Sequence, residues 1–121
     1  MFELKVRRSF AAAHQLRGYA GKCEALHGHN YIVEVTVRAE RLNGIGLALD
    51  FKDLKNTLDG LLDGFDHTYL NDLEPFARDN PSAENIAAVI YRALKPAVPA
   101  PATLAAVTVW ENENSAATYW E

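Results

Sequence analysis

Two long segments with alternating apolar residues, each with histidine at one end, constrain the fold of this chain most strongly. Residues 2–14 place apolar side chains at most even positions and end at His14. Residues 27–42 begin with His27-Gly28-His29 and continue in a run rich in β-branched residues. Such alternation is typical of β-strands that bury one face. We therefore predict two strands, and their pairing would bring the histidine ends together.

Three of the four histidines in the chain lie at these strand ends. Side chains at positions i and i+2 of a strand point to the same face, so His27 and His29 can converge on one ion. Pairing of the strands would add His14. Histidines in strands are often buried without a metal, but three neutral imidazoles that converge favour Zn²⁺, with a fourth position left for water or substrate.

The middle of the chain predicts two helices. Asp50 is a predicted N-cap, and behind it apolar residues recur at helical spacing as far as Phe65. A loop over residues 66–72 follows. The second helix is expected to open at Asn80-Pro81-Ser82, with the proline in its first turn, and to stop at Pro96.

The end of the chain predicts a hairpin, in which Val107 and Val109 alternate towards Glu111 and a turn near residues 112–115 reverses the direction. The element order is then β-β-α-α-β-β. This order predicts an α+β fold, with two helices on one face of a four-stranded antiparallel sheet. A chain of 121 residues fits a single domain over residues 1–121.

Composition narrows the expected location and partners. The net charge of −4 provides no basic face for nucleic-acid binding. One cysteine excludes an internal disulfide and fits a reducing cytosol. The first residues lack a signal-peptide core, and no stretch is long enough to span a bilayer. We therefore expect a cytoplasmic protein without nucleic-acid or membrane partners.

Three further features each have a structural and a chemical interpretation. Cys23 is either a small buried apolar residue or, with a cation or histidine nearby, a base or nucleophile. Asp66-His67 is either a polar loop or a proton relay in which the carboxylate sets the imidazole tautomer. Glu111 is either a solvated strand end or an acceptor for two parallel N–H donors of a planar heterocycle.

Five motifs occur in order along the chain: Ser9-Phe10-Ala11-Ala12-Ala13-His14, Cys23-x-x-x-His27-Gly28-His29-Asn30-Tyr31, Asp50-Phe51-Lys52-Asp53-Leu54-Lys55, Asp66-His67-x-Tyr69-Leu70-Asn71 and Asn80-Pro81-x-x-Glu84-Asn85. Together they resemble the 6-pyruvoyltetrahydropterin synthase superfamily, most closely its 6-carboxytetrahydropterin synthase branch in queuosine biosynthesis. The resemblance extends over essentially the whole chain. It implies a tunnelling fold whose protomers join their sheets into a barrel, as a trimer or hexamer with active sites between subunits.

The resemblance also implies roles for individual residues. The three strand-end histidines would bind Zn²⁺, Glu111 would anchor the pterin, and Cys23 would be the general base with Asp66 and His67 as its relay. The implied lyase converts 7,8-dihydroneopterin triphosphate to 6-carboxy-5,6,7,8-tetrahydropterin, with release of acetaldehyde and triphosphate.

Two alternatives remain beside this interpretation. The first is the sibling 6-pyruvoyltetrahydropterin synthase, which keeps the three-carbon side chain. Only three residues separate Cys23 from His27, and this short spacing favours the carboxy-forming branch. The second is a non-catalytic pterin- or purine-binding protein with structural zinc. Ser82-Ala83 and Asn112 depart from the family pattern, where Thr-Ser and a threonine are usual, at positions expected to contact the pterin.

Overall fold

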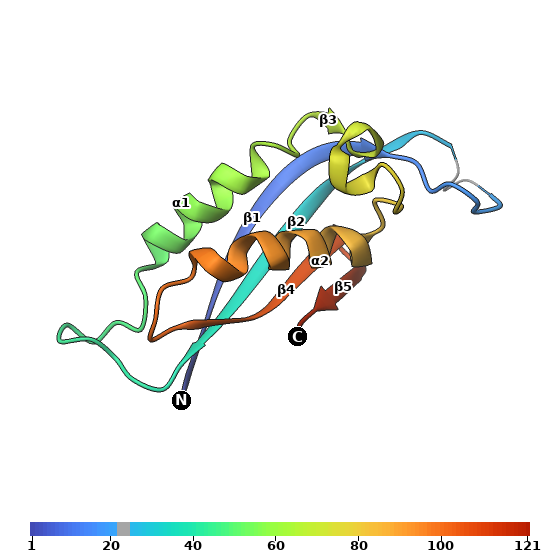
Figure 1. The fold of residues 1–121 in the computed structure, drawn as a ribbon. Helices are drawn as coiled ribbons and strands as arrows, with labels where there is room; N and C mark the ends of the chain where they lie inside the picture. The colour runs from blue at the N-terminus through green and yellow to red at the C-terminus, as the bar shows by residue number, and fades with distance from the viewer. Residues whose placement is uncertain (22–24) are drawn as a thin grey trace.

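The computed structural model of the protein describes residues 1–21 and 25–121. Its strands and helices are β1 (Phe2–His14), β2 (His27–Ala39), α1 (Phe51–Leu62), β3 (Thr68–Tyr69), α2 (Ala83–Leu94), β4 (Thr103–Asn112) and β5 (Ser115–Tyr119). Short 3₁₀ turns occupy Leu70–Asp72, Glu74–Phe76 and Lys95–Ala97. The strand order is β3-β1-β2-β4-β5, and both helices cover the same face of the sheet (Figure 1). The predicted α+β fold is confirmed.

The strand β3 was not predicted, because residues 66–72 were expected to form a loop. Here Thr68 and Tyr69 pair in parallel with Ala12 and Ala13 of β1. The chain reaches this position because His67 has a φ of +57°, a left-handed conformation that few residues other than glycine adopt. The His67 backbone N–H then donates to the Ala11 carbonyl at 2.6 Å.

Two predicted boundaries differ from the structure. The strand expected over residues 27–42 ends at Ala39, because its partner strand begins at Phe2, opposite that residue. The expectation that Pro81 lies in the first turn of the second helix is wrong. The Ser82 side chain caps this helix by accepting the N–H of Asn85, so the helix begins at Ala83 and the Pro81 carbonyl is left outside it.

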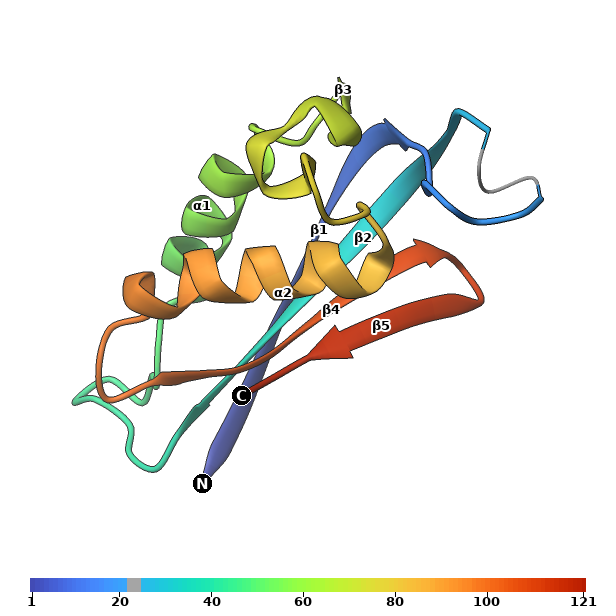
Figure 2. The same ribbon diagram turned by 45° about the vertical axis from the view of Figure 1, so that its right-hand side comes forward.

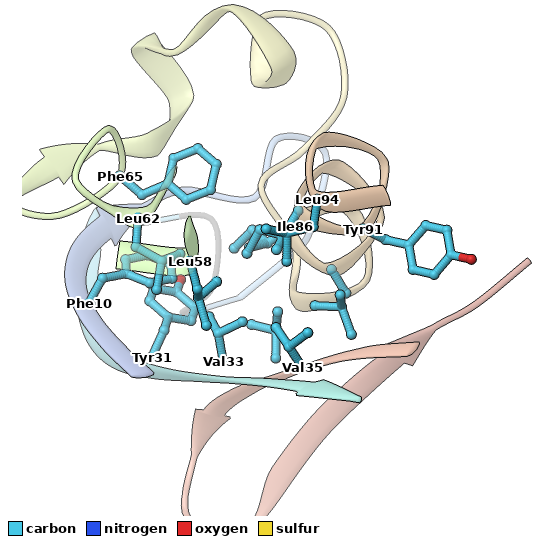
Figure 3. Packing of buried hydrophobic residues seen from close by; sticks show 14 of the residues in the cluster. Phe10, Tyr31, Val33, Val35, Leu58, Leu62, Phe65, Ile86, Tyr91 and Leu94 are labelled. Carbon is cyan, nitrogen blue, oxygen red and sulfur yellow. The ribbon is translucent and has the colours of Figure 1, made fainter. Parts of the chain in front are cut away.

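The core lies between the helices and the sheet. Helix α1 packs over β1, whereas α2 packs over β4 and β5. Figure 3 shows the side chains that fill this layer, with those of the helices above those of the sheet. Its fully or almost fully buried members include Leu54, Leu58 and Leu62 of α1, Ile86, Ile90 and Leu94 of α2, and Val33, Val35, Val107 and Val109 of the strands. None of the helices in the described ranges has the length and apolar character needed to cross a membrane.

The ladder between β1 and β2 sets the register of the functional residues. It runs without interruption from the pair Phe2 and Ala39 at one end to the pair His14 and His27 at the other. Figure 2 shows the two ends well separated, with the segment after β2 at one and the segment after β1 at the other. The pairing predicted from the sequence thus places the strand-end histidines side by side.

Candidate active site

Three histidines converge at one end of the β1–β2 ladder. His14 is the cross-strand partner of His27, and His29 is two residues further along the same strand. One ring nitrogen from each histidine lies within 4.8 Å of the corresponding nitrogens of the other two. His14 is completely buried, whereas His27 and His29 are half-buried. The geometry is therefore that of a three-histidine metal site with one side open.

Backbone carbonyls fix the tautomers of two of these rings. His14 Nδ1 lies 2.8 Å from the Pro81 carbonyl oxygen, and His27 Nδ1 lies 2.7 Å from that of Ala25. A carbonyl can only accept, so each Nδ1 carries a proton and, in a neutral ring, each Nε2 carries a lone pair. These two Nε2 atoms lie only 2.9 Å apart. Lone pairs on nitrogens at this distance repel each other unless a cation or a proton lies between them. A metal ion bound to both nitrogens would remove this repulsion.

Burial reinforces the neutral form of the rings. It lowers the pKa of His14 and of His29, because a buried imidazolium loses its hydration. His29 Nε2 is itself buried and makes no hydrogen bond within the described residues. The Tyr31 ring packs against both rings, at centroid distances of 5.9 Å from His14 and 5.4 Å from His29. Neutral ring nitrogens with available lone pairs fit a metal ion.

Glu111 is the fourth polar side chain at this site. Its Oε1 lies 3.3 Å from His14 Nε2 and 3.4 Å from His29 Nε2. It also lines a hollow of about 240 Å³ between the start of α2 and the β4–β5 hairpin, together with Leu16, Ser82, Ala83, Glu84 and Ala116. A carboxylate in this place can bind a metal ion or receive N–H donors from a molecule in the hollow. Ser82 and Ala83, where the sequence departs from the family pattern, border the same hollow.

Asp66 and His67 form a pair of their own beside β1. The Asp66 carboxylate accepts the backbone N–H of Ala11 at 2.9 Å and lies 2.9 Å from His67 Nδ1. The bond from Ala11 is the main reason why the pKa of Asp66 is lowered, and His67 adds to the effect. An ionised carboxylate favours the proton on Nδ1, which leaves His67 Nε2 free to exchange protons.

Within the described residues, this pair is not bonded to the three histidines. The side chain of His67 is 81% exposed, and no hydrogen bond or ion pair between described residues joins it to the histidine cluster. Together with His29 of the cluster, His67 lines a hollow of about 560 Å³ over the ends of β1 and β2, which is also bordered by Ala11, Ala13, Gly28, Asn30 and Tyr69. The small residues of this wall, Ala11, Ala13 and Gly28, leave room for another molecule or another chain.

Comparison with known proteins identifies the family. The profile described as 6-pyruvoyl tetrahydropterin synthase matches residues 3–121. The chain belongs to this family. The resemblance stated from the five motifs is thus confirmed.

Several members of the pterin synthase family are similar over most of their length. A 6-carboxy-5,6,7,8-tetrahydropterin synthase from Synechocystis is 42% identical over 93% of this chain and 88% of its own. A dihydroneopterin monophosphate aldolase from Pyrococcus furiosus is 36% identical, covering 87% and 85% respectively. Among solved structures, the 6-pyruvoyl tetrahydropterin synthase of Caenorhabditis elegans has a TM-score of 0.89 at 31% identity, over 99% of this chain and 95% of that one. These relatives are enzymes that act on pterins, and they carry out different reactions.

The structure brings together four of the seven site residues predicted from the sequence. His14, His27, His29 and Glu111 meet at one place. Asp66 and His67 pair with each other elsewhere. Cys23 lies outside the described residues, so its role remains a prediction.

Other groups at the site were not predicted individually. The carbonyls of Pro81 and Ala25, which orient two histidines, belong to residues without reactive side chains. Asn71 and Asn80 bind the backbone that follows His14. Both asparagines occur in motifs typical of the pterin synthase family, and that occurrence was the only indication of their importance in the sequence.

Proposed function

We propose that the protein is a zinc-dependent 6-carboxy-5,6,7,8-tetrahydropterin synthase. In this reaction 7,8-dihydroneopterin triphosphate and one water molecule give 6-carboxytetrahydropterin, acetaldehyde and triphosphate, in the biosynthesis of queuosine and related 7-deazapurines. One observation carries the proposal: the Nε2 atoms of His14 and His27, 2.9 Å apart, converge with a third imidazole and with the Glu111 carboxylate, which lines a hollow. In a chain of the pterin synthase family, this arrangement suits a metal ion and a pterin in contact with it.

The choice of branch is supported by relatives and by spacing. Several curated relatives, including those from Synechocystis and Bacillus subtilis, are 6-carboxytetrahydropterin synthases. The three residues between Cys23 and His27 also favour that branch. A second candidate is 6-pyruvoyltetrahydropterin synthase, supported by the likeness to the C. elegans enzyme. A third is aldol cleavage of a dihydroneopterin phosphate, supported by the likeness to the Pyrococcus enzyme.

In the proposed reaction, His14, His27 and His29 would hold the metal ion. When bound there, Zn²⁺ would supply a Lewis acid that makes the C–H bonds next to the side-chain hydroxyls of the substrate more acidic. Glu111 accepts N–H donors from the pterin ring and so fixes the side chain of the substrate beside the metal site. Glu111 connects the hollow that it lines to the histidine cluster, because its Oε1 lies 3.3 Å from His14 Nε2 and 3.4 Å from His29 Nε2.

Cys23 moves protons on the substrate side chain as general base, and Asp66 and His67 form its relay. Asp66 keeps the proton of His67 on Nδ1, so that Nε2 can receive and return a proton. Because His67 is exposed and no hydrogen bond or ion pair among the described residues joins it to the histidine cluster, we propose that it serves the site of a neighbouring subunit.

Exposed sheet edges support this assembly. β1 pairs with β3 only at Ala12 and Ala13, so most of its outer edge has no partner in the described chain. β5 pairs with β4 alone and forms the other edge. Exposed edges bind further strands readily, so we propose that protomers join edge to edge into a barrel, as a trimer or hexamer.

The test is a product assay by mass spectrometry on zinc-loaded protein with 7,8-dihydroneopterin triphosphate, with Cys23→Ala as control. We expect 6-carboxytetrahydropterin and acetaldehyde from the wild type. We expect the variant to fold and bind zinc but to lose turnover. Full activity of Cys23→Ala would refute the proposed role of the cysteine.

Other outcomes assign the protein elsewhere. A pyruvoyl product would move it to the sibling branch. Cleavage of dihydroneopterin monophosphate in preference to the triphosphate would favour the aldolase. Tight pterin binding without turnover of either substrate would indicate a binding protein.

A further inference from the structure

Two asparagine side chains hold the segment that follows His14 as a neighbouring strand would. Asn71 accepts the backbone N–H of Gln15 at 2.9 Å and donates to the Gln15 carbonyl at 2.8 Å. Asn80 accepts the N–H of Arg17 at 2.9 Å and donates to its carbonyl at 2.9 Å. In an antiparallel ladder, alternate residues exchange such paired bonds with the adjacent strand. The two side-chain amides therefore hold the backbone in place beyond His14, the last residue of β1 that pairs with β2.

Asn80 also holds the group that orients His14. Its neighbour Pro81 supplies the carbonyl that accepts from His14 Nδ1 at 2.8 Å, and this bond is buried. The carbonyl of Asn80 itself accepts from the Asn85 side chain at 2.8 Å, which attaches the peptide to the first turn of α2. The peptide before Pro81 is thus held from two sides, by the backbone of Arg17 and by the helix.

Further bonds tie the same segment to β3 and to the 3₁₀ turn over Glu74–Phe76. The Arg17 guanidinium donates to the Phe76 carbonyl at 2.8 Å, and the Tyr69 hydroxyl donates to the Gln15 side chain at 2.9 Å. The chain after His14 is thus restrained at Gln15 and at Arg17. At each of these residues, both the backbone and the side chain are hydrogen-bonded to other described residues. This density of bonds in a segment outside the sheet needs an explanation beyond loop closure.

We propose that Asn80 and Asn71 are positioning residues for the metal site, which hold the His14 imidazole in the orientation that directs Nε2 at the ion. The reason is geometric. The ring is set by its own backbone and by the Pro81 carbonyl. Asn71 binds the backbone of Gln15, next to His14, whereas Asn80 binds that of Arg17 and directly precedes Pro81. Partners that orient a metal ligand in this way typically contribute roughly 10–100-fold to affinity. The inference rests on the metal site of the proposed function, but on none of the pterin reactions.

A matched control separates this role from a general contribution to stability. Asn43 also makes two side-chain bonds to backbone, accepting the N–H groups of Ile45 and Leu47 at 3.0 Å each. It lies in the loop that follows Ala39 of β2, whereas His14 and His27 pair at the opposite end of the β1–β2 ladder. Asn43→Ala therefore removes as many bonds as Asn80→Ala, at a place where they cannot orient a metal ligand.

The experiment measures Zn²⁺ and Co²⁺ affinity of the full chain by competition with a chromogenic chelator, together with the Co²⁺ absorption spectrum and the melting temperature without metal. We expect Asn80→Ala to weaken metal binding about ten-fold or more and to shift the Co²⁺ bands. Asn71→Ala should act in the same direction and less strongly. Asn43→Ala should lower the melting temperature while metal affinity stays at the wild-type value.

Wild-type affinity in both Asn80→Ala and Asn71→Ala would overturn the proposal while leaving the metal site intact. Failure of the wild-type chain to bind either ion would overturn the metal site as well. If Asn80→Ala does not fold, Asn80→Asp provides the test, because it keeps the acceptor for Arg17 N–H and loses the donor to the carbonyl. We expect that variant to fold and to bind metal more weakly than the wild type, and equal affinity would refute the positioning role.

Discussion

The two ends of the β1–β2 ladder differ in the burial of their polar side chains. At the histidine end, His14 is fully buried, and its ring is bonded to a carbonyl from the segment before α2. At the opposite end, Glu3 and Arg38 form an exposed ion pair at 3.0 Å, with side-chain exposures of 41% and 58%. The strands and their antiparallel pairing are the same at both ends, but only one end is covered by other segments.

This difference decides what each contact is worth. A buried polar atom that loses its partner cannot be rescued by water, so it costs about 1–3 kcal/mol. An exposed ion pair exchanges its partner for water and contributes about 0–1 kcal/mol. The covered end can therefore hold chemical groups in one arrangement, whereas the open end tolerates change. The following predictions test this contrast, from the largest expected effect to the smallest.

Replacement of His14 by alanine should have the largest effect. We expect His14→Ala to lose stoichiometric metal binding, because one of three ligands is removed. The free energy of unfolding should fall by about 1–3 kcal/mol, since the Pro81 carbonyl loses its partner. The measurements are metal content and denaturant unfolding. His67→Ala, at an exposed position, is the control that should keep both properties. A His14→Ala protein with one Zn²⁺ per chain would contradict the site.

Replacement of Glu111 by alanine tests whether this carboxylate binds the pterin or the metal ion. We expect pterin affinity to fall by about 1.5–3 kcal/mol, roughly 10–100-fold, because a charged acceptor is lost. Metal content should remain the same. Isothermal titration with a dihydropterin measures pterin affinity, and metal analysis measures metal content. Loss of metal with unchanged pterin affinity would show instead that the oxygen near His14 and His29 is a metal ligand.

Acidification should destabilise the metal-free protein, because it favours protonation of the buried histidines at the covered end of the ladder. The pKa values of His14 and His29 are lowered by burial from the ordinary value of 6.5. Below pH 6.5 the unfolded chain therefore binds protons that the folded chain does not, and stability falls as the pH decreases. Urea unfolding at pH 7.5 and 5.5 measures the loss, and His14→Ala should reduce it. Equal stability at the two pH values would contradict the burial of neutral imidazoles.

Replacement of Arg38 by alanine should have the smallest effect. The ion pair with Glu3 is exposed, so we expect Arg38→Ala to lower the free energy of unfolding by no more than about 1 kcal/mol. Metal affinity should be unchanged, because the residue lies at the other end of the ladder. Denaturant unfolding and metal titration test both. A larger loss of stability than in His14→Ala would reverse the proposed contrast between the ends.

Much of the fold followed from local patterns in the sequence. Alternation over residues 2–14 predicted β1 with its observed bounds, because a period of two belongs to a strand with one buried face. Asp50 caps α1 as predicted, with its side chain accepting the N–H of Lys52. The spacing of His27 and His29 placed both on one face, since alternate residues of a strand share a face. These features depend on residues that are close along the chain.

Tertiary structure alone decided what surrounds the histidines. The carbonyl that orients His14 is 67 residues away along the chain, and the amides that hold Gln15 and Arg17 are 56 and 63 residues away. The strand β3 and the position of Asp66 likewise depend on bonds to Ala11, 55 residues earlier. Backbone carbonyls are the same in every residue, so no side-chain pattern marks the one that will meet an imidazole. Folding brings such groups together, and only then do their distances and burial determine how the histidines are held.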